Sequence, residues 1–370
     1  MLEGLPCGRH ADPHAGLAPI GLPPLPDTPG SDPRPTLRTL AERTGLHTST
    51  VSRALRRDRA SDPTAALVHA AATELGYRPD PLAAGLRSGR TGAIGMVAHS
   101  LTDLAQALIH EEVDQYVLAH GYDVLVAATR DDPEAQRKRV ELLLSRRVDG
   151  LIIADAHRDG AYADWVATLG VPYVLVMRGA PGHPAITVDD ELAGRMVADH
   201  LADLGHTRMA HLAGPSWSAA SYGRAAGFRA RLAERGIGLE DDLVEPGGLH
   251  ATTGRAAMER LLDRRRDFTA VFCASDFVAF GATSALGAAG LRVGDDVALV
   301  GYNDLQAATA MDLTSVRTPQ DELGRIAAEA LLAAIDGCEP QSRTLAPELV
   351  VRGSTAGSGA PLADAAGAAR

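Results

Sequence analysis

From Thr91 onward, short runs of apolar and β-branched residues alternate with longer stretches in which apolar residues recur at helical spacing. This alternation predicts strands at residues 93–97, 123–127, 150–153, 173–177, 208–212, 270–273 and 297–301. It predicts helices between them, including 104–120, 133–146, 191–204, 221–235 and 277–289. Apolar strands that alternate with helices favour a parallel sheet covered on both faces. Because roughly 260 residues exceed one doubly wound unit, we expect two α/β lobes with a ligand cleft at the carboxyl ends of their strands.

The two ends of the chain differ in composition from this body. Of the 370 residues, 45% are apolar and 22% are charged, so most of the chain can bury a core. Residues 1–34, however, are rich in Pro and Gly and lack a basic start, so we expect a disordered extension rather than a signal peptide. Small residues dominate again from Gly353, and we assign residues 356–370 to a disordered tail. His10 and His14 lie in the extension and are expected to be solvent-exposed bystanders rather than metal ligands.

Charge separates a small basic unit from a large acidic body. The chain carries a formal charge of −11, but residues 36–90 hold nine Arg against five acids, a net +4. Residues 1–35 carry −2, so the remaining 280 residues carry −13. The average charge therefore conceals a basic module that could meet a polyanion.

Several classes of protein are disfavoured by what the sequence lacks. Cys7, Cys273 and Cys338 are far apart and show no C-x-x-C or Cys/His spacing, so neither a disulfide framework nor a structural zinc is indicated. No run approaches the ~18 apolar residues of a membrane span. No dinucleotide, phosphate-loop or H-E-x-x-H motif indicates a reaction. We expect no enzymatic activity, no cofactor and no metal.

Residues 35–79 predict a domain of three short helices. Thr36 can cap the first helix, whose apolar stripe is Leu37, Leu40 and Ala41, and Thr44-Gly45 ends it. A second helix is expected to open at about Thr48 and to run through TSTVSRALRR. Its inward residues are Val51, Ala54 and Leu55, which leaves outward Thr48, Ser49, Ser52 and Arg53.

A third helix should start at Ser61 or Asp62, followed by Pro63, and end at Gly76. Its predicted inner face is Ala66, Leu67, Ala70, Ala71 and Leu75. Residues 80–91 follow as a hinge, in which Asp80 and Pro81 can begin a helix of barely two turns that needs a partner to be stable.

Two helices joined by a tight glycine turn, with a slim polar and basic second helix, form a helix-turn-helix. Such a helix enters the major groove, where Arg and hydroxyl groups reach base edges and phosphates. Periodicity alone leaves open a second interpretation, a three-helix module for protein–protein contacts with a solvated basic face.

The residues of this head resemble those of a known family. The stretch Thr36 to Leu55, with its T-V-S-R segment at residues 50–53, is followed by E-L-G-Y-R-P at residues 74–79. This combination is similar to the head of the lactose-repressor (LacI) family of bacterial transcription regulators. The resemblance implies that Thr48, Ser49 and Arg53 read bases, with Ser52 beside them. It also implies that Leu86 is the hinge leucine that wedges into the minor groove. Asp80 departs from the usual Asn, and Gly85 is a poor helix former.

The resemblance continues through the body to about Thr355. Its landmarks are R-R-V-D-G-L-I-I at 146–153, H-L-A-D-L-G-H at 200–206, L-A-G-P at 212–215, R-A-A-G-F at 224–228, S-D-F-V-A-F-G-A at 275–282, G-L-R-V-G-D-D-V-A-L-V-G-Y-N-D at 290–304 and E-L-G-R at 322–325. The family resemblance implies a periplasmic-binding-protein-like core over residues 92–355 that binds a small effector, commonly a sugar or a nucleoside-like metabolite.

Several residues are candidates for the effector site. Arg224 matches the family arginine that reaches the ligand, although a buried salt bridge is the alternative role. Asp276 is expected at a strand end facing the cleft, where it could accept two hydroxyl hydrogen bonds, with Ser275 beside it. Asn303 stands where many relatives carry Asp and keeps amide donor and acceptor capacity.

Three further residues are weaker candidates. His99 and Ser100 follow the first strand and are expected to line the mouth of the cleft. Trp217 could stack on a sugar face, and ordinary loop packing is an equal alternative. The family's usual aromatic pair after the first strand is replaced by Thr102-Asp103-Leu104, so no particular sugar is indicated.

The N-terminal segment and the DNA-binding head distinguish a transcriptional regulator from a solute-binding protein. An extracytoplasmic solute-binding protein would share the core but would carry a signal peptide and no DNA-binding head. We therefore predict a cytoplasmic, nucleoid-associated transcriptional regulator, by family habit a repressor, that binds double-stranded operator DNA under the control of a sugar-like effector. Two heads must straddle a pseudo-palindrome, so we expect a homodimer. No heptad-bearing C-terminal helix is present to join two dimers into a tetramer.

Overall fold

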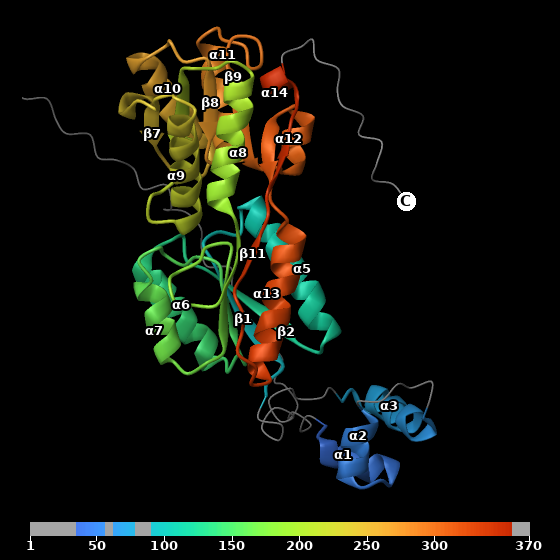
Figure 1. Ribbon diagram of the computed structural model, residues 1–370. Helices are drawn as coiled ribbons and strands as arrows, with labels where there is room; N and C mark the ends of the chain where they lie inside the picture. The colour runs from blue at the N-terminus through green and yellow to red at the C-terminus, as the bar shows by residue number, and fades with distance from the viewer. Residues whose placement is uncertain (1–34, 56–61, 78–89, 357–370) are drawn as a thin grey trace, which may run out of the picture. The chain divides into compact units, whose positions relative to one another are not determined.

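The computed structural model describes residues 35–55, 62–77 and 90–356 (Figure 1). Contacts divide the chain into two units, Met1–Asp80 and Pro81–Arg370. The predicted hinge helix with Leu86 lies outside the described residues, as do the N-terminal extension and residues 357–370. In the part of the chain that is described, no helix is both long and apolar enough to cross a membrane.

The first unit contains the three predicted helices of the head, α1 (Leu37–Thr44), α2 (Thr48–Ala54) and α3 (Pro63–Leu75). The hydroxyl of Thr36 accepts the N–H of Thr39 at 3.2 Å, and the carboxylate of Asp62 caps α3 in the same way. Gly45 ends α1 at φ +69°, in the left-handed region that suits glycine. The helices enclose a small core of Leu40, Ala41, Val51, Ala54, Ala65, Val68, Ala71 and Ala72.

The predicted inner face of α3 is wrong by about one residue. Leu67 is 52% exposed, and Ala66 and Ala70 are exposed as well, whereas Ala65 and Val68 are buried. Ala71 is buried as predicted and Leu75 packs against the core. An alanine-rich helix gives little contrast between its faces, so the position of Val68 decides which face turns inward.

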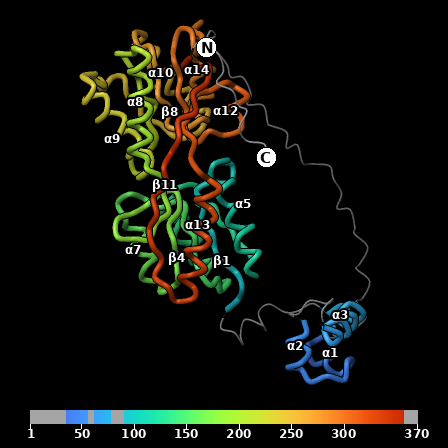
Figure 2. The backbone as a smooth tube through the Cα atoms, turned by 45° about the vertical axis from the view of Figure 1, so that its right-hand side comes forward, coloured from blue at the N-terminus to red at the C-terminus, as the bar shows by residue number. Residues whose placement is uncertain are grey.

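The second unit has two α/β lobes, each built on one sheet (Figures 1 and 2). The sheet of the first lobe is parallel throughout. Its strand order is β11 (Arg343–Leu345), β5 (Ala185–Val188), β4 (Tyr173–Val176), β3 (Leu151–Ile153), β1 (Ala93–Ala98) and β2 (Asp123–Ala128).

The sheet of the second lobe has one antiparallel edge, where β12 pairs with β10. Its strand order is β12 (Glu348–Val350), β10 (Thr314–Arg317), β9 (Ala298–Asn303), β8 (Ala270–Cys273), β6 (Met209–Ala213) and β7 (Val244–Pro246). Other pairs in this sheet are parallel, so their carboxyl ends share one edge.

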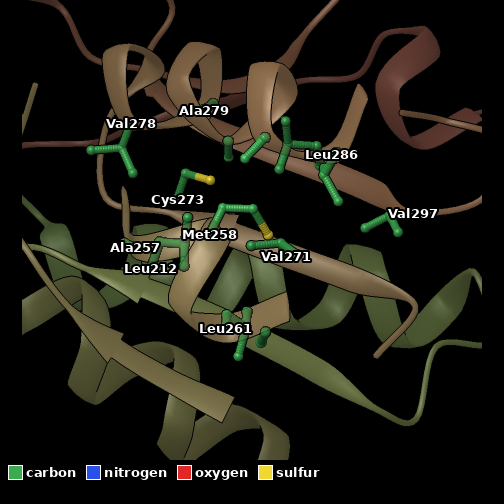
Figure 3. Close-up of a cluster of buried hydrophobic side chains, with 14 of the residues drawn as sticks. Leu212, Ala257, Met258, Leu261, Val271, Cys273, Val278, Ala279, Leu286 and Val297 are labelled. Carbon is green, nitrogen blue, oxygen red and sulfur yellow. The ribbon is translucent and has the colours of Figure 1, made fainter. Parts of the chain in front are cut away.

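Helices cover both faces of each sheet, as the apolar strands predicted. In the first lobe, α5 (Leu104–Ala119) and α13 (Gln320–Ile335) pack on one face, and α6 (Pro133–Ser145) and α7 (Ala161–Thr168) on the other. In the second lobe, α8 (Asp190–Asp203) and α9 (Ala219–Glu234) cover one face, and α10 (Ala251–Arg264) and α11 (Asp276–Ala288) the other. Figure 3 shows the core under α10 and α11, where Met258 and Leu261 meet Val271 of β8.

The chain passes between the lobes three times. It leaves the first lobe after β5, returns after β10 to form α13, and leaves again between β11 and β12. Figure 2 shows this last passage in red. Each lobe is therefore discontinuous in sequence, and three segments of chain connect the two lobes.

The predicted strands and helices of the body are present, with ends shifted by no more than two residues. Several short elements were not predicted, among them β5, β7, β10, β11 and β12. The small-residue tail predicted from Gly353 also needs correcting, because α14 (Gly353–Ala356) is helical and buries Ser354 and Thr355. The Ser354 hydroxyl donates to the carbonyl of Leu299 at 2.6 Å, which ties this segment to β9.

Candidate functional site

Helix α2 presents a polar outer surface on the head. Its buried residues Val51 and Ala54 face the head core. This packing leaves Ser49 and Arg53 exposed and Thr48 and Ser52 half-buried, which together are the four described residues predicted to contact DNA.

Arg53 differs from two other arginines of the head in its partners. Arg38 pairs with Glu42 at 2.9 Å, and Arg43 pairs with Glu74 at 2.8 Å. Within the described residues, Arg53 makes no ion pair. Its guanidinium can therefore be directed to a phosphate or a base edge without breaking an internal pair.

A cleft lies between the two lobes of the second unit, and both lobes supply its walls. The first lobe contributes the residue after β4, the last residue of β5 and the beginnings of α5 and α13, and Asp190 at the start of α8 lies where the chain enters the second lobe. The second contributes α9 and the residues at the ends of β8 and β9. The cavity within the cleft measures about 40 Å³. Its polar lining residues are Asp103, Asp190, Arg224, Ser275, Tyr302, Asn303, Thr318 and Gln320.

Arg224 lines this cavity and is also held by the protein. Its Nε donates to the carbonyl of Ala220 at 3.1 Å, and its Nη1 donates to the carbonyl of Ala274 at 2.5 Å. Nε lies 3.1 Å from a carboxylate oxygen of Asp190, and the guanidinium carbon lies 3.8 Å from the ring centroid of Tyr302. The two roles proposed for Arg224, cleft residue and buried salt bridge, are therefore combined in one side chain.

Asp190 and Tyr302 complete the group around Arg224. The Tyr302 hydroxyl donates to Asp190 at 2.6 Å. Burial raises the pKa of Asp190 to about 6, even though Arg224 and the Tyr302 hydroxyl favour its ionised form. Burial also raises the pKa of Tyr302, so the phenol stays protonated and remains a donor. The positive charge of Arg224 is therefore buried at the cleft and is already balanced by the carboxylate of Asp190.

Ser275 and Asn303 also line the cavity, as predicted. The Ser275 hydroxyl caps α11 by accepting the N–H of Val278 at 3.2 Å, and it donates to the carbonyl of Leu249 at 3.1 Å. Asn303 has φ +101°, and its carbonyl accepts a hydrogen bond from the Gln320 side chain at 2.8 Å. This last bond joins the end of β9 in the second lobe to the start of α13 in the first.

His99 and Ser100 are close to the cleft, but the lining residue in this segment is Asp103. The His99 Nε2 lies 3.0 Å from the Asp103 carboxylate. Burial opposes ionisation of Asp103, but the hydrogen bond with His99 and the N–H groups of Gln106 and Ala105 lower its pKa below the usual value. The Ser100 hydroxyl bonds with Thr102 at 2.8 Å. His99 therefore acts on the cleft through Asp103 rather than by lining it.

The prediction for Asp276 needs correcting. Asp276 is fully buried and is not among the cavity-lining residues, because its side chain turns into the second lobe. Its carboxylate accepts the Ser315 hydroxyl at 2.6 Å and the N–H of Leu305 at 2.7 Å. Burial raises its pKa to about 7. Both oxygens are thus engaged in holding the ends of β9 and β10 to α11.

Trp217 likewise does not line the cavity. Its ring stacks on His157 with centroids 4.5 Å apart, and the guanidinium carbon of Arg178 lies 5.1 Å from its centroid. Trp217 therefore packs against protein side chains and does not offer an open ring face to a ligand.

Five polar cleft residues were missed from the sequence: Asp103, Asp190, Tyr302, Thr318 and Gln320. Asp190 and Gln320 begin the helices that follow two of the passages between lobes, and those passages were not predicted because β5 and β10 were not. Tyr302 immediately precedes Asn303 at the end of β9, so its position at the carboxyl end of a predicted strand could have marked it as a cleft residue.

Known proteins of similar sequence share this architecture. A family described as periplasmic binding protein-like domain matches residues 198–355. The ribose operon repressor of Escherichia coli K12 is 31% identical over 327 residues, which cover 86% of this chain and 99% of that protein. The chain belongs to the LacI family of transcriptional regulators.

Solved structures of LacI-family regulators agree with this assignment. A lac repressor dimer bound to operator and the anti-inducer ONPF has a TM-score of 0.77 and 31% identity, covering 86% of this chain and 98% of that one. The regulator CelR in complex with cellobiose has a TM-score of 0.67 and 33% identity, covering 87% and 100%. The predicted fold class, a helix-turn-helix head with a two-lobed core, is confirmed.

Proposed function

We propose that this LacI-family regulator binds operator DNA as a homodimer and that a small uncharged, hydroxyl-bearing effector in the interlobe cleft controls its affinity. The observation that carries the proposal is the presence, in one chain, of a helix-turn-helix with an exposed Arg53 and a two-lobed body whose cleft contains Arg224, Ser275 and Asn303. By family habit we expect repression.

The DNA interface is assigned to the outer side of α2. Thr48, Ser49, Ser52 and Arg53 supply hydroxyl groups and one guanidinium on a slim helix, which suits the donor and acceptor pattern of the major groove. Leu86 is proposed as the minor-groove wedge on the family resemblance. The body carries most of the negative charge, so the head alone is suited to a polyanion.

The dimer contact is assigned to the exposed side of α5. Leu104, Leu108 and Leu118 are 47%, 43% and 62% exposed, and they lie with Glu111 and Gln115 at alternating spacings of four and three residues. That spacing forms one stripe along a helix, as in a helix–helix seam. Exposed leucines gathered on one side of a helix are typical of interfaces, and a second copy of α5 is a self-complementary partner.

The cleft favours a neutral ligand. Arg224 is the cation that lines the described cavity, and Asp190 already balances its charge, while Asp103 adds a negative charge. A phosphate or carboxylate ligand would therefore lack a free cationic partner. Serine, asparagine and glutamine side chains instead offer the mixed donors and acceptors that hydroxyl groups need.

Coupling between the cleft and DNA follows from the three passages between the lobes. An effector with different affinity for two lobe arrangements shifts their populations, and the change is passed to the segment that precedes β1 and carries the heads. No catalytic step is proposed, and the protein is expected to act at the chromosome in the cytoplasm.

The test is operator binding by fluorescence anisotropy, using DNA from upstream of the coding sequence and a panel that begins with D-ribose and cellobiose. We expect specific binding that at least one neutral sugar alters. A protein that binds a sugar but shows no preference for its upstream DNA over random duplex would instead support a solute-binding role.

A further inference from the structure

A second set of contacts joins the two lobes outside the cleft cavity. Trp217, between β6 and α9 of the second lobe, stacks on His157, which follows β3 of the first lobe. The carbonyl of Trp217 accepts the N–H of Arg158 at 2.9 Å. The Arg158 guanidinium carbon in turn lies 4.1 Å from the ring centroid of Tyr222, on α9.

Arg178, after β4 of the first lobe, completes this set by lying 5.1 Å from the Trp217 ring centroid. Trp217 and Tyr222 on one lobe thus meet His157, Arg158 and Arg178 on the other, and we call these five residues the interlobe latch. None of them is among the residues that line the cavity.

Within the described residues, two buried groups of the first lobe near the latch lack a hydrogen-bond partner: one on Arg178, itself a latch residue, and one on Asp155, two residues before His157. Arg178 is 1% exposed and donates to Asp131 at 2.6 Å through Nη1, whereas its Nη2 has no hydrogen-bond partner in the described structure. Asp155 is fully buried and accepts the Thr129 hydroxyl on one oxygen, and its other oxygen is unpartnered. Buried polar groups without partners oppose burial, so water would stabilise both groups once the lobes part.

The latch residues and the groups beneath them therefore act in opposite directions. Aromatic stacking and cation–π contacts favour the joined lobes. The buried Asp155 oxygen and the Arg178 nitrogen favour their separation. The net preference for the joined lobes is therefore smaller than the aromatic contacts alone would give.

We propose that the interlobe latch, centred on Trp217, holds the lobes in the arrangement whose cleft is too small for an effector, and so sets the cost of opening the cleft. The cavity measures about 40 Å³. An engineered cavity of about 150 Å³ is what accommodates a benzene ring, and a sugar ring is larger. Breaking the latch thus increases the fraction of molecules with an open cleft. The consequence for effector affinity rests on the proposed function, but the opening itself does not.

The experiment uses the full chain with Trp165→Phe, which leaves Trp217 as the tryptophan that fluoresces. Acrylamide quenching then measures how accessible Trp217 is. Opening of the cleft itself is measured by hydrogen exchange at peptides 101–109 and 274–279. These peptides line the cleft from opposite lobes and contain no latch residue. His157→Ala and Arg158→Ala each remove one latch contact while keeping Trp217.

We expect each variant to increase quenching of Trp217 and to speed exchange at both cleft peptides by about fivefold, the effect of losing one aromatic or cation–π contact. The matched control is Arg137→Ala in the same background. Arg137 lies on α6 of the first lobe, and its ring contact is with position 165 rather than with a latch residue, so its removal should change neither measurement. Circular dichroism checks that each variant is folded.

Two results would overturn the proposal. Trp217 in the parent could be as accessible to acrylamide as free tryptophan, in which case the contact does not persist. Alternatively, His157→Ala and Arg158→Ala could increase quenching while exchange at both cleft peptides stays unchanged. Trp217 would then be a local loop contact that does not hold the lobes. Neither result depends on whether the protein binds DNA or a sugar.

Discussion

Gly194 on α8 lies against the backbone carbonyl of Arg224 on α9. A β-carbon added at Gly194 would be 2.1 Å from that oxygen, and one added at Gly227 would be 2.0 Å from the carbonyl oxygen of Glu191. Both distances are far below contact, and both obstacles are backbone atoms. The close approach of α8 and α9, which positions Arg224 at the cleft, therefore depends on these two glycines.

We predict that Gly194→Ala lowers the free energy of unfolding by about 1–3 kcal/mol or more, because the helices must separate. It should also weaken the response to effector, because Arg224 moves with its backbone. The matched control is Gly287→Ala in α11, where an added β-carbon meets no atom within 4 Å and helix propensity should improve. Thermal unfolding of the two variants checks this, and equal melting temperatures would contradict it.

Arg53→Ala should weaken specific DNA binding by about 1–3 kcal/mol and relax base preference at one position of each half-site. Arg38→Ala is the control, because Arg38 is exposed on α1 and already paired with Glu42. Anisotropy titrations on operator and random duplex separate the outcomes. An equal loss on both DNAs would show that Arg53 contacts only phosphate.

Arg224→Ala should abolish the effector response and destabilise the body, because it leaves Asp190 buried without its cation. Removing one partner of a buried pair costs about 3–5 kcal/mol. Asp190→Asn in the same chain should restore much of the stability without restoring the response. Urea unfolding and effector titration check the two parts. If the Arg224→Ala protein still changes its DNA affinity at the parent's effector concentration, the effector site lies elsewhere.

Leu108→Glu should convert the dimer to monomer, because it replaces an exposed leucine of the α5 stripe with a second negative charge one turn from Glu111. Leu142→Glu is matched in exposure, at 43% for both leucines, but lies on α6 of the same lobe. Sedimentation velocity at micromolar concentration should show dimers for the parent and for Leu142→Glu, and no tetramer. A dimeric Leu108→Glu protein would move the interface to another surface.

Asp276 should make stability fall as pH rises toward neutrality, whereas His211, whose pKa burial lowers to about 4, acts with the opposite sign. Burial raises its pKa to about 7, from 3.8 in an exposed carboxyl, so the folded state binds this proton more tightly than the unfolded state does. Between about pH 4 and 7 the folded state therefore holds more protons, and the free energy of unfolding decreases as pH increases. Asp190 contributes with the same sign. Asp276→Asn should reduce this slope in urea unfolding at pH 5 and pH 8; an unchanged slope would contradict the assignment.

Most of the fold could be predicted because it depends on local pattern. Strands such as Ala270–Cys273 are apolar runs that follow a polar residue and end shortly before Ser275 and Asp276, and Thr36, Gly45 and Asp62 are local cap signals. β11 and β12 escaped prediction because they are three residues long and exist through pairing with distant strands. Their formation is decided by tertiary contacts, which a local window does not contain.

The candidate site was harder to predict than the fold. A strand end can be located from sequence, but the direction of the next side chain cannot, and this is why Asp276 was assigned to the cleft instead of to Ser315 and Leu305. Trp217 was placed near the correct edge, but its partners His157 and Arg178 lie after β3 and β4 of the other lobe. Arg224 was located correctly, whereas its partner Asp190 required knowing where the chain changes lobes.

The three passages between the lobes also set the order in which the protein can be completed on the ribosome. The first lobe begins at β1, but α13 and the edge strand β11 are synthesised only after most of the second lobe. Until residues 320–345 emerge, the nascent first lobe has one sheet face partly bare and lacks one edge strand. Exposed apolar faces and unpaired strand edges of this kind promote aggregation in incomplete chains. A prematurely terminated chain that ends after β10 should therefore be a substrate for chaperones rather than a stable single-lobe fragment.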